Sequence, residues 1–260
     1  MLSIYKGIRV FYWAVSIGCI VGTAVATYFY PTHMIEIISI MTIIICLTLI
    51  ILMKVTRNRF KNEVMSLLYD CHAQNFLDKV ESLLGNRRSK SMKSTYAWLM
   101  ALGYEVIGDY EAMRSNCMNI TVKTHMSEYH RRMCSYYVEA DEIELAKKEI
   151  EALKKIALTA KAPDKVQIER YIGECVRAIK IKTHDLDGLT QHFEREDSLK
   201  AVEPVLLTKV SVAETYGQVL IFTGEYETAR KQLLFASRYG GDTKYKKYAD
   251  TLLKSIDPAN

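Results

Sequence analysis

Hydrophobic residues fill two uninterrupted runs near the start of the chain, at residues 10–30 and 37–53, with a short polar segment at 31–36 between them. A surface helix of a soluble domain is apolar along one stripe, whereas these runs of 21 and 17 residues are apolar on every face. As helices they would span about 31 Å and about 26 Å, close to the hydrocarbon thickness of a bilayer. The pattern predicts a transmembrane helical hairpin over residues 1–55, with spans at about 10–30 and 37–55.

A cleaved signal peptide is the alternative interpretation of the first run. The apolar region of a signal peptide has about 7–15 residues and is followed by a cleavage site of small residues. The first run is longer, ends in Tyr28, Phe29 and Tyr30, and leads into a second apolar run. These features favour the hairpin.

Basic residues stand before the first run and after the second, at the two ends of the hairpin that would face the same side of a membrane. Lys6 and Arg9 precede the first run, and Lys54, Arg57, Arg59 and Lys61 follow the second, whereas the connecting segment carries only His33 and Glu36. Because Lys and Arg concentrate on the cytoplasmic side of membranes, both termini and the remaining chain are predicted to be cytoplasmic. The short spans and the tight turn favour a bacterial plasma membrane over an organelle membrane.

The net charge of +5 is concentrated after the second run, since residues 54–93 hold nine Lys or Arg against four Asp or Glu. We expect contact with anionic lipid headgroups there, at about 1 kcal/mol per basic residue near the surface. The residues concerned are Lys54, Arg57, Arg59 and Lys61. Nucleic-acid binding is the alternative, but the sequence has no helix-turn-helix pattern and no RNA-binding aromatic motif, so no nucleic-acid partner is expected.

Small residues recur every four positions in the first run, at Ala14, Gly18, Gly22 and Ala26. They would share one helix face, on which another helix can approach closely. We expect this face to pack against the second span of the same hairpin. Formation of a homodimer, or docking to another membrane protein, is the alternative.

The chain after the second run is predicted to be entirely helical, since it is poor in glycine and proline and shows no alternating strand pattern. No glycine or proline interrupts residues 34–84, so the second span is expected to continue as one helix to Cys71, with Asn75 capping the next helix. Further N-caps are expected at Asp109, Thr124, Asp141, Asp164 and Asp185.

A helix–turn–helix unit repeats from residue 63 onward. Each turn contains an acid or asparagine followed by an apolar residue, and these apolar residues are Phe76, Tyr110, Ile143, Leu186 and Tyr226. Their spacings are 34, 33, 43 and 40 residues. Repetition at such a period is typical of stacked helical repeats.

The unit at residues 213–236 resembles a tetratricopeptide (TPR) repeat. The matching positions are Tyr216, Gly217 and Leu220 in its first helix, Gly224 and Tyr226 in its turn, and Ala229, Leu233 and Ala236 in its second helix. Gly217 and Ala229 would let the paired helices approach, and Leu233 and Tyr226 would fill the space to the next pair. The resemblance extends more loosely over residues 63–239 and implies a TPR-like α-solenoid at 56–260, with a capping helix at 243–256.

The resemblance also implies a groove, lined by the first helix of each unit, that binds a protein or a peptide. The implied groove residues are Glu128, Arg131, Arg132, Ser135, Tyr171, Glu174, Lys182, Glu214, Gln218 and Phe222. The Lys/Asn set with which some members of the family clamp a terminal carboxylate is absent, since Val64 and Leu68 occupy those places. Binding of a chaperone tail is therefore disfavoured.

The sequence offers little catalytic chemistry. It has no P-loop, GxGxxG, HExxH or GxSxG motif. His130 and Cys134 lie four residues apart and could suggest a metal pair, but Cys134 falls at a packing position of its repeat. We expect no enzyme activity, no cofactor and no metal.

Three functions remain. The first is a membrane-anchored adaptor or scaffold whose solenoid recruits a protein or peptide and helps to assemble a membrane complex. The second is a regulator that responds to a ligand or peptide and acts on a membrane partner. The third, and the least favoured, is an enzyme with a site that the sequence does not reveal.

Overall fold

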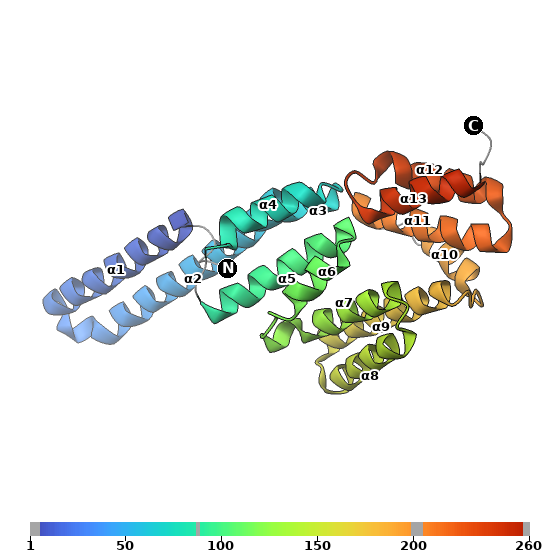
Figure 1. Cartoon of the computed structure of the whole chain (residues 1–260). Coiled ribbons are helices and arrows are strands. Elements are labelled where there is room, and N and C mark those ends of the chain that lie inside the picture. Colours follow the sequence, from blue (N-terminus) through green and yellow to red (C-terminus); the bar gives the residue numbers. More distant parts are fainter. Residues whose placement is uncertain (1–5, 87–88, 199–204, 257–260) are drawn as a thin grey trace. The chain divides into compact units, whose positions relative to one another are not determined.

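The computed structural model describes residues 6–86, 89–198 and 205–256, and every regular element in these ranges is a helix (Figure 1). The all-helical prediction is thereby confirmed for the described part of the chain. Internal contacts divide the chain into two units, Met1–Ser66 and Leu67–Asn260.

The first unit contains two long helices, α1 (Lys6–Phe29) and α2 (Met34–Phe60), joined by the 3₁₀ turn η1 (Pro31–His33). Both helices are long and apolar enough to cross a membrane. Their apolar side chains are mostly exposed, as at Trp13 and Ile51. In the core of a soluble protein such side chains would be buried. The two predicted apolar helices are therefore present, and the turn lies where the sequence placed it.

The expected small-residue contact between α1 and α2 is seen only in part. Ala14 and Gly18 are exposed, and a Cβ atom added at Gly18 would meet nothing within 4 Å. A Cβ atom at Gly22 would lie 3.8 Å from Met41 Cε of α2, and Ala26 is half-buried. The two halves of the small-residue face thus have different surroundings.

The helix that begins with α2 continues through η2 (Lys61–Met65), a π-helical turn, and α3 (Ser66–Tyr69). The predicted continuation is correct almost to its expected end at Cys71, which adopts a left-handed conformation with φ 63°. The next helix, α4 (Ala73–Leu84), has His72 at its N-cap position. Asn75 therefore lies inside α4, and its prediction as an N-cap is wrong.

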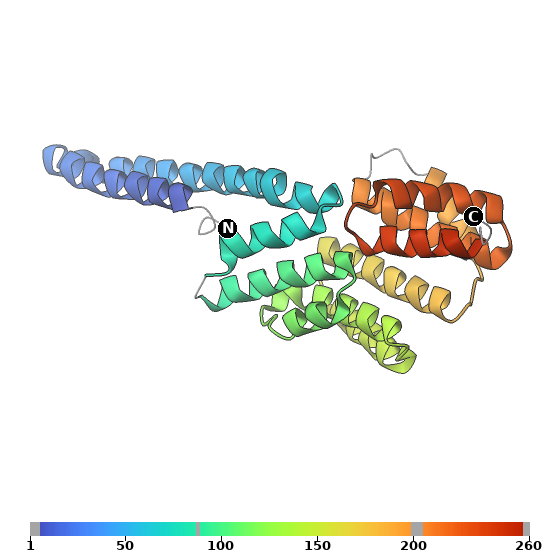
Figure 2. The same ribbon diagram turned by 45° about the horizontal axis from the view of Figure 1, so that its top comes forward.

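The second unit is a succession of helices, and most consecutive helices pack on one another (Figure 2). After α4 these are α5 (Lys90–Ile107), α6 (Tyr110–Cys117), the short η3 (Lys123–His125), α7 (Met126–Glu139), α8 (Ile143–Thr159), α9 (Ala162–Lys182), α10 (Leu189–Ser198), α11 (Leu206–Thr223), α12 (Tyr226–Tyr239) and α13 (Lys244–Ile256). Short turns, such as those that begin at Gly108 and Gly224, make the helices on either side run back along one another.

Two turns show why the helices end where the sequence predicted. Gly108 and Gly224 end α5 and α11 with φ of 87° and 83°, a left-handed conformation that glycine adopts without strain. Asp109 then caps α6, since its carboxylate accepts a 2.9 Å hydrogen bond from the Ala112 amide.

Other predicted N-caps are wrong. Thr124 lies inside η3, and Asp164 lies inside the first turn of α9. Asp141 is in a left-handed turn with φ 63°, and Glu142 precedes α8 instead. Asp185 does not precede a helix directly; its carboxylate accepts a 3.4 Å hydrogen bond from the Asp187 amide within the turn before α10.

The packing of α11 on α12 agrees with the predicted role of Gly217. A Cβ atom at Gly217 would lie 2.7 Å from the Leu233 side chain and 3.4 Å from the Ala229 carbonyl oxygen, so only glycine allows this approach. Leu233 is fully buried, whereas Tyr226 is 56% exposed. Tyr226 therefore does not fill the space that the resemblance assigned to it.

The turn between α12 and α13 contacts the start of α4 within the second unit. The Asp242 carboxylate accepts hydrogen bonds of 2.6 and 2.8 Å from the Ala73 and Gln74 amides, and the Asp242 amide donates to the Cys71 carbonyl at 3.2 Å. A Cβ atom at Gly241 would clash with that same carbonyl. Asp242 therefore supplies the N-cap of α4 from 169 residues away.

Helix α13 was expected only to cover the exposed end of the helix stack with polar residues, but it also contributes apolar side chains to the core. Ala249 is fully buried, and Tyr245 and Leu252 pack with it. Its polar side chains also contact earlier helices, since Lys247 Nζ donates to the Ile107 carbonyl at 3.2 Å and Tyr248 donates to Glu139 at 3.2 Å. One face of α13 is thus directed at α5 and α7.

Candidate functional site

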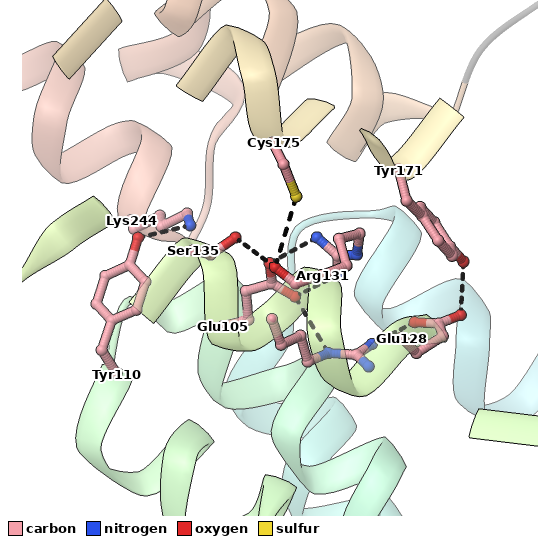
Figure 3. A network of polar contacts seen from close by, with 9 residues as sticks. Glu105, Tyr110, Glu128, Arg131, Ser135, Tyr171, Cys175 and Lys244 are labelled. Atoms are coloured by element: carbon pink, nitrogen blue, oxygen red, sulfur yellow. Dashed lines mark hydrogen bonds and ion pairs between the residues drawn. The ribbon is translucent and has the colours of Figure 1, made fainter. Parts of the chain in front are cut away.

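A buried network of charged groups joins α5, α7 and α9 (Figure 3). Arg131 of α7 donates two hydrogen bonds, of 2.8 and 2.6 Å, to the two carboxylate oxygens of Glu105 of α5. Arg132 Nε lies 3.2 Å from Glu105, and its Nη2 lies 2.9 Å from Glu128. Tyr171 of α9 donates a 2.7 Å hydrogen bond to Glu128. The paired Arg–carboxylate geometry fixes both distance and orientation.

Electrostatics keeps this network ionised. Burial by itself would raise the pKa of Glu105, but the charges of Arg131 and Arg132 outweigh burial and lower that pKa to about 2. The pKa of Glu128 is also lowered, because the same two arginines and the Tyr171 hydroxyl outweigh its burial. The Arg132 side chain is 1% exposed. Its charge is therefore compensated within the protein.

Four of the ten predicted groove residues thus lie within this network, namely Glu128, Arg131, Arg132 and Tyr171. Their charged groups and hydrogen-bond donors pair within the network and are not available in an open groove. Arg131 and Arg132 were expected to bind an acidic ligand, and this expectation is wrong. Both guanidinium groups already form ion pairs with Glu105. The sequence prediction did not single out Glu105, which lies in α5 and is separated from α7 by α6 and η3.

Four other predicted residues line one cavity of about 550 Å³ in the second unit, namely Ser135, Lys182, Glu214 and Gln218. They come from α7, α9 and α11, as the resemblance implied. The remaining two lie elsewhere: Glu174 is 3.2 Å from Arg170, and Phe222 packs edge-on against His184 at 4.5 Å between ring centroids.

Helix α13 forms another wall of this cavity with Lys244, Tyr245 and Tyr248. These residues were missed because α13 was expected only to cover an end. A signal was present in the sequence: Tyr245, Tyr248 and Leu252 follow the helical spacing of one buried face.

Glu214 is the unusual group of the cavity. It is 5% exposed, and its one hydrogen bond to a described residue is a 3.3 Å contact with the Thr215 hydroxyl. That hydroxyl has a single proton and lies closer, at 2.8 Å, to the Ser211 carbonyl oxygen. Burial raises the pKa of Glu214 to about 7, assisted by Glu139 and opposed by Lys244 and Thr215. The cavity thus contains a carboxylate without a strong partner among the described residues.

The two lysines of the cavity differ in their surroundings. Lys244 Nζ donates a 2.9 Å hydrogen bond to the Tyr110 hydroxyl and lies 4.9 and 5.4 Å from the ring centroids of Tyr110 and Tyr245. Such contacts stabilise its positive charge. Lys182 is exposed and makes no ion pair within the described part of the chain.

The predicted lipid-contacting residues Lys54, Arg57, Arg59 and Lys61 are all exposed. Arg59 also forms a 2.6 Å ion pair with Glu63. The side chains of all four are thus accessible from outside the protein.

His130 and Cys134 do not form a metal pair. His130 Nδ1 lies 2.6 Å from Glu149, and Cys134 is buried in an apolar cluster with Cys175. Within the described ranges, no three His, Cys, Asp or Glu side chains gather as metal ligands would.

Comparison of the chain with protein-family models, with curated proteins and with solved structures finds no match. The resemblance to TPR repeats therefore stays a prediction.

Proposed function

We propose that this protein is a membrane-anchored adaptor, in which α1 and α2 hold the helical second unit at the cytoplasmic face of a membrane, where it binds a protein partner. The observation that carries the proposal is the pair of long helices with exposed apolar side chains that precedes a unit built of packed helix pairs. Exposed apolar surface of this extent needs a lipid or protein environment.

The predicted topology belongs to the same proposal. The charges at Lys54, Arg57 and Lys61 support a cytoplasmic position for the second unit, and their exposure supports contact with anionic headgroups. The TPR-like character of the helix pairs supports a protein partner, since stacked helix pairs offer extended binding surfaces.

Site-specific photocrosslinking in cells tests the adaptor with the full chain. A crosslinking residue is placed at Leu158 or Val166, which are 84% and 68% exposed in the second unit, or at Ile17 or Leu47 in the apolar helices. A partner captured from the second unit supports the adaptor. Capture only from Ile17 and Leu47, or no capture at any position, would refute it.

The cavity supports a second function, a regulator that responds to a ligand. A buried carboxylate without a strong partner is costly unless something compensates it, and a bound ligand would do so. Because α13 forms one wall, occupancy would be transmitted to the turn that caps α4. Hydrogen exchange in α13 and at the start of α4 should slow when the ligand binds, and unchanged exchange would refute regulation by this route.

A further inference from the structure

We infer that the cavity between α7, α9, α11 and α13 binds a small zwitterion, with the ammonium group of the ligand at Glu214 and its anionic group at Lys182. The inference rests on the proposed ligand-responsive function and names the class of ligand. It starts from Glu214, which is nine-tenths buried, faces the cavity and lacks a strong hydrogen-bond donor among the described residues.

No Lys or Arg in the described ranges forms an ion pair with Glu214. Lys244 lines the same cavity, but its ammonium group is hydrogen-bonded to Tyr110 and lies near two aromatic rings, and no ion pair joins it to Glu214 in the described ranges. A ligand ammonium group would supply the missing donor, and a hydrogen bond between two charged groups is stronger than one between neutral groups. Tyr245 and Tyr248 offer aromatic surface to the same cation.

The lysines restrict the ligand further. Lys182 and Lys244 both line the cavity, so a ligand with two cationic groups would meet like charge. Lys182 makes no ion pair in the described part of the chain and is available to an anionic group. A molecule with one ammonium and one acidic group matches this arrangement. The cavity volume of about 550 Å³ lies in the usual range of small-molecule sites.

Four probes with the same carbon chain separate the charge requirements: 5-aminopentanoate, pentylamine, pentanoate and 1,5-diaminopentane. Their binding to the full-length protein in detergent micelles is measured by ligand-observed NMR titration. We expect 5-aminopentanoate to bind at least about tenfold more tightly than each of the others, since each lost charged contact costs about 1.4 kcal/mol or more. Equal binding of all four, or no saturable binding of 5-aminopentanoate, would overturn the inference.

Two substitutions test which protein side chain binds the ammonium end of the ligand and which binds its acidic end. Glu214→Gln should remove the advantage of 5-aminopentanoate over pentanoate, and Lys182→Met should remove its advantage over pentylamine. Glu227→Gln and Lys209→Met are the matched controls, because both residues are exposed and neither lines the cavity. Unchanged probe preference in Glu214→Gln would place the ligand elsewhere. The comparison of probes on the wild-type chain decides the charge requirement even where a variant does not fold.

Two measurements distinguish the ligand class from the proposed regulator: the preference among the four probes and the hydrogen exchange of α13. Zwitterion binding without slower hydrogen exchange in α13 would keep the site and refute the regulator. A change in exchange caused by pentylamine or 1,5-diaminopentane, with no preference for the zwitterion, would keep the regulator and refute the ligand class.

Discussion

Replacement of Glu214 by glutamine should stabilise the second unit at neutral and alkaline pH and leave its stability unchanged in acid. The pKa of Glu214 is raised from an ordinary value of 4.5 to about 7, chiefly by burial, so the folded state binds this proton more tightly than the unfolded state does. The stability of the wild type should therefore be highest below pH 4.5 with respect to this group, and should fall as the pH rises to about 7.

The magnitude follows from the two pKa values. A tenfold change in a protonation equilibrium is worth about 1.4 kcal/mol, so keeping Glu214 ionised above pH 7 costs the folded state about 3 kcal/mol. Glutamine cannot ionise and avoids this cost. The other charged groups around the cavity, Glu139, Lys182 and Lys244, are unchanged in the variant, and so are the phenols of Tyr110, Tyr245 and Tyr248.

Urea unfolding of the full-length chain in micelles measures the difference. The sequence has two tryptophans, so a Trp13→Phe background leaves Trp98 in the second unit as the only tryptophan, whose fluorescence is excited selectively at long wavelength. The free energy of unfolding of Glu214→Gln should exceed that of the parent by up to about 3 kcal/mol at pH 8, and by nearly nothing at pH 4.5.

Glu227→Gln is the control for loss of a carboxylate, since Glu227 is exposed in the adjacent helix α12 and should change stability by less than about 0.5 kcal/mol. If Glu214→Gln and the parent show the same pH dependence between pH 4.5 and 8, Glu214 does not carry the cost assigned to it. Glu214 would then be compensated by another group in the folded protein.

Three further substitutions test the packing of the second unit. Glu105→Ala should destabilise it by about 3–5 kcal/mol in urea unfolding, because two buried guanidinium groups lose their carboxylate. The pKa of Glu105 is lowered to about 2 in the folded state. The stability that the wild type gains from this carboxylate should therefore be complete above pH 4.5 and disappear as the pH falls toward 2. Asp242→Ala should cost about 1–2 kcal/mol and speed amide hydrogen exchange at the start of α4, whereas exchange unchanged there would refute the long-range cap. Gly217→Ala should destabilise by about 1–3 kcal/mol through its clash with Leu233. The matched change Gly173→Ala, where the nearest atom lies at 3.5 Å, should stabilise α9 by about 0.5–1 kcal/mol, and equal effects at the two glycines in thermal unfolding would contradict the packing argument.

Local chemistry explains what the sequence predicted correctly. Apolar runs, the left-handed glycines at Gly108 and Gly224, and the cap at Asp109 each depend on a few neighbouring residues. The N-caps predicted at Thr124 and Asp164 were wrong because a short oxygen-bearing side chain favours a cap without fixing its position.

The features that the sequence did not predict depend on contacts between helices that are far apart along the chain. Glu105 and Arg131 are 26 residues apart, and nothing in either helix alone indicates that the other will neutralise it. The groove predicted from the resemblance therefore included arginines that pair within the protein. Ser135, Lys182, Glu214 and Gln218 do line a common cavity, but the wall supplied by α13 depends on how the last helix packs, which periodicity cannot give.

The cap that Asp242 provides for α4 has a consequence for synthesis of the chain. The amides of Ala73 and Gln74 leave the ribosome long before their acceptor, which follows 169 residues after Ala73. At about 5–20 residues per second, roughly 10–30 s of translation separate the two. During that interval α4 can form only with an open first turn, so the start of the second unit is completed late, after α5 to α12 have been made. A ribosome stalled before Asp242 would therefore carry a nascent chain in which the Ala73 and Gln74 amides still lack this acceptor, although every helix from α5 to α12 has already been made.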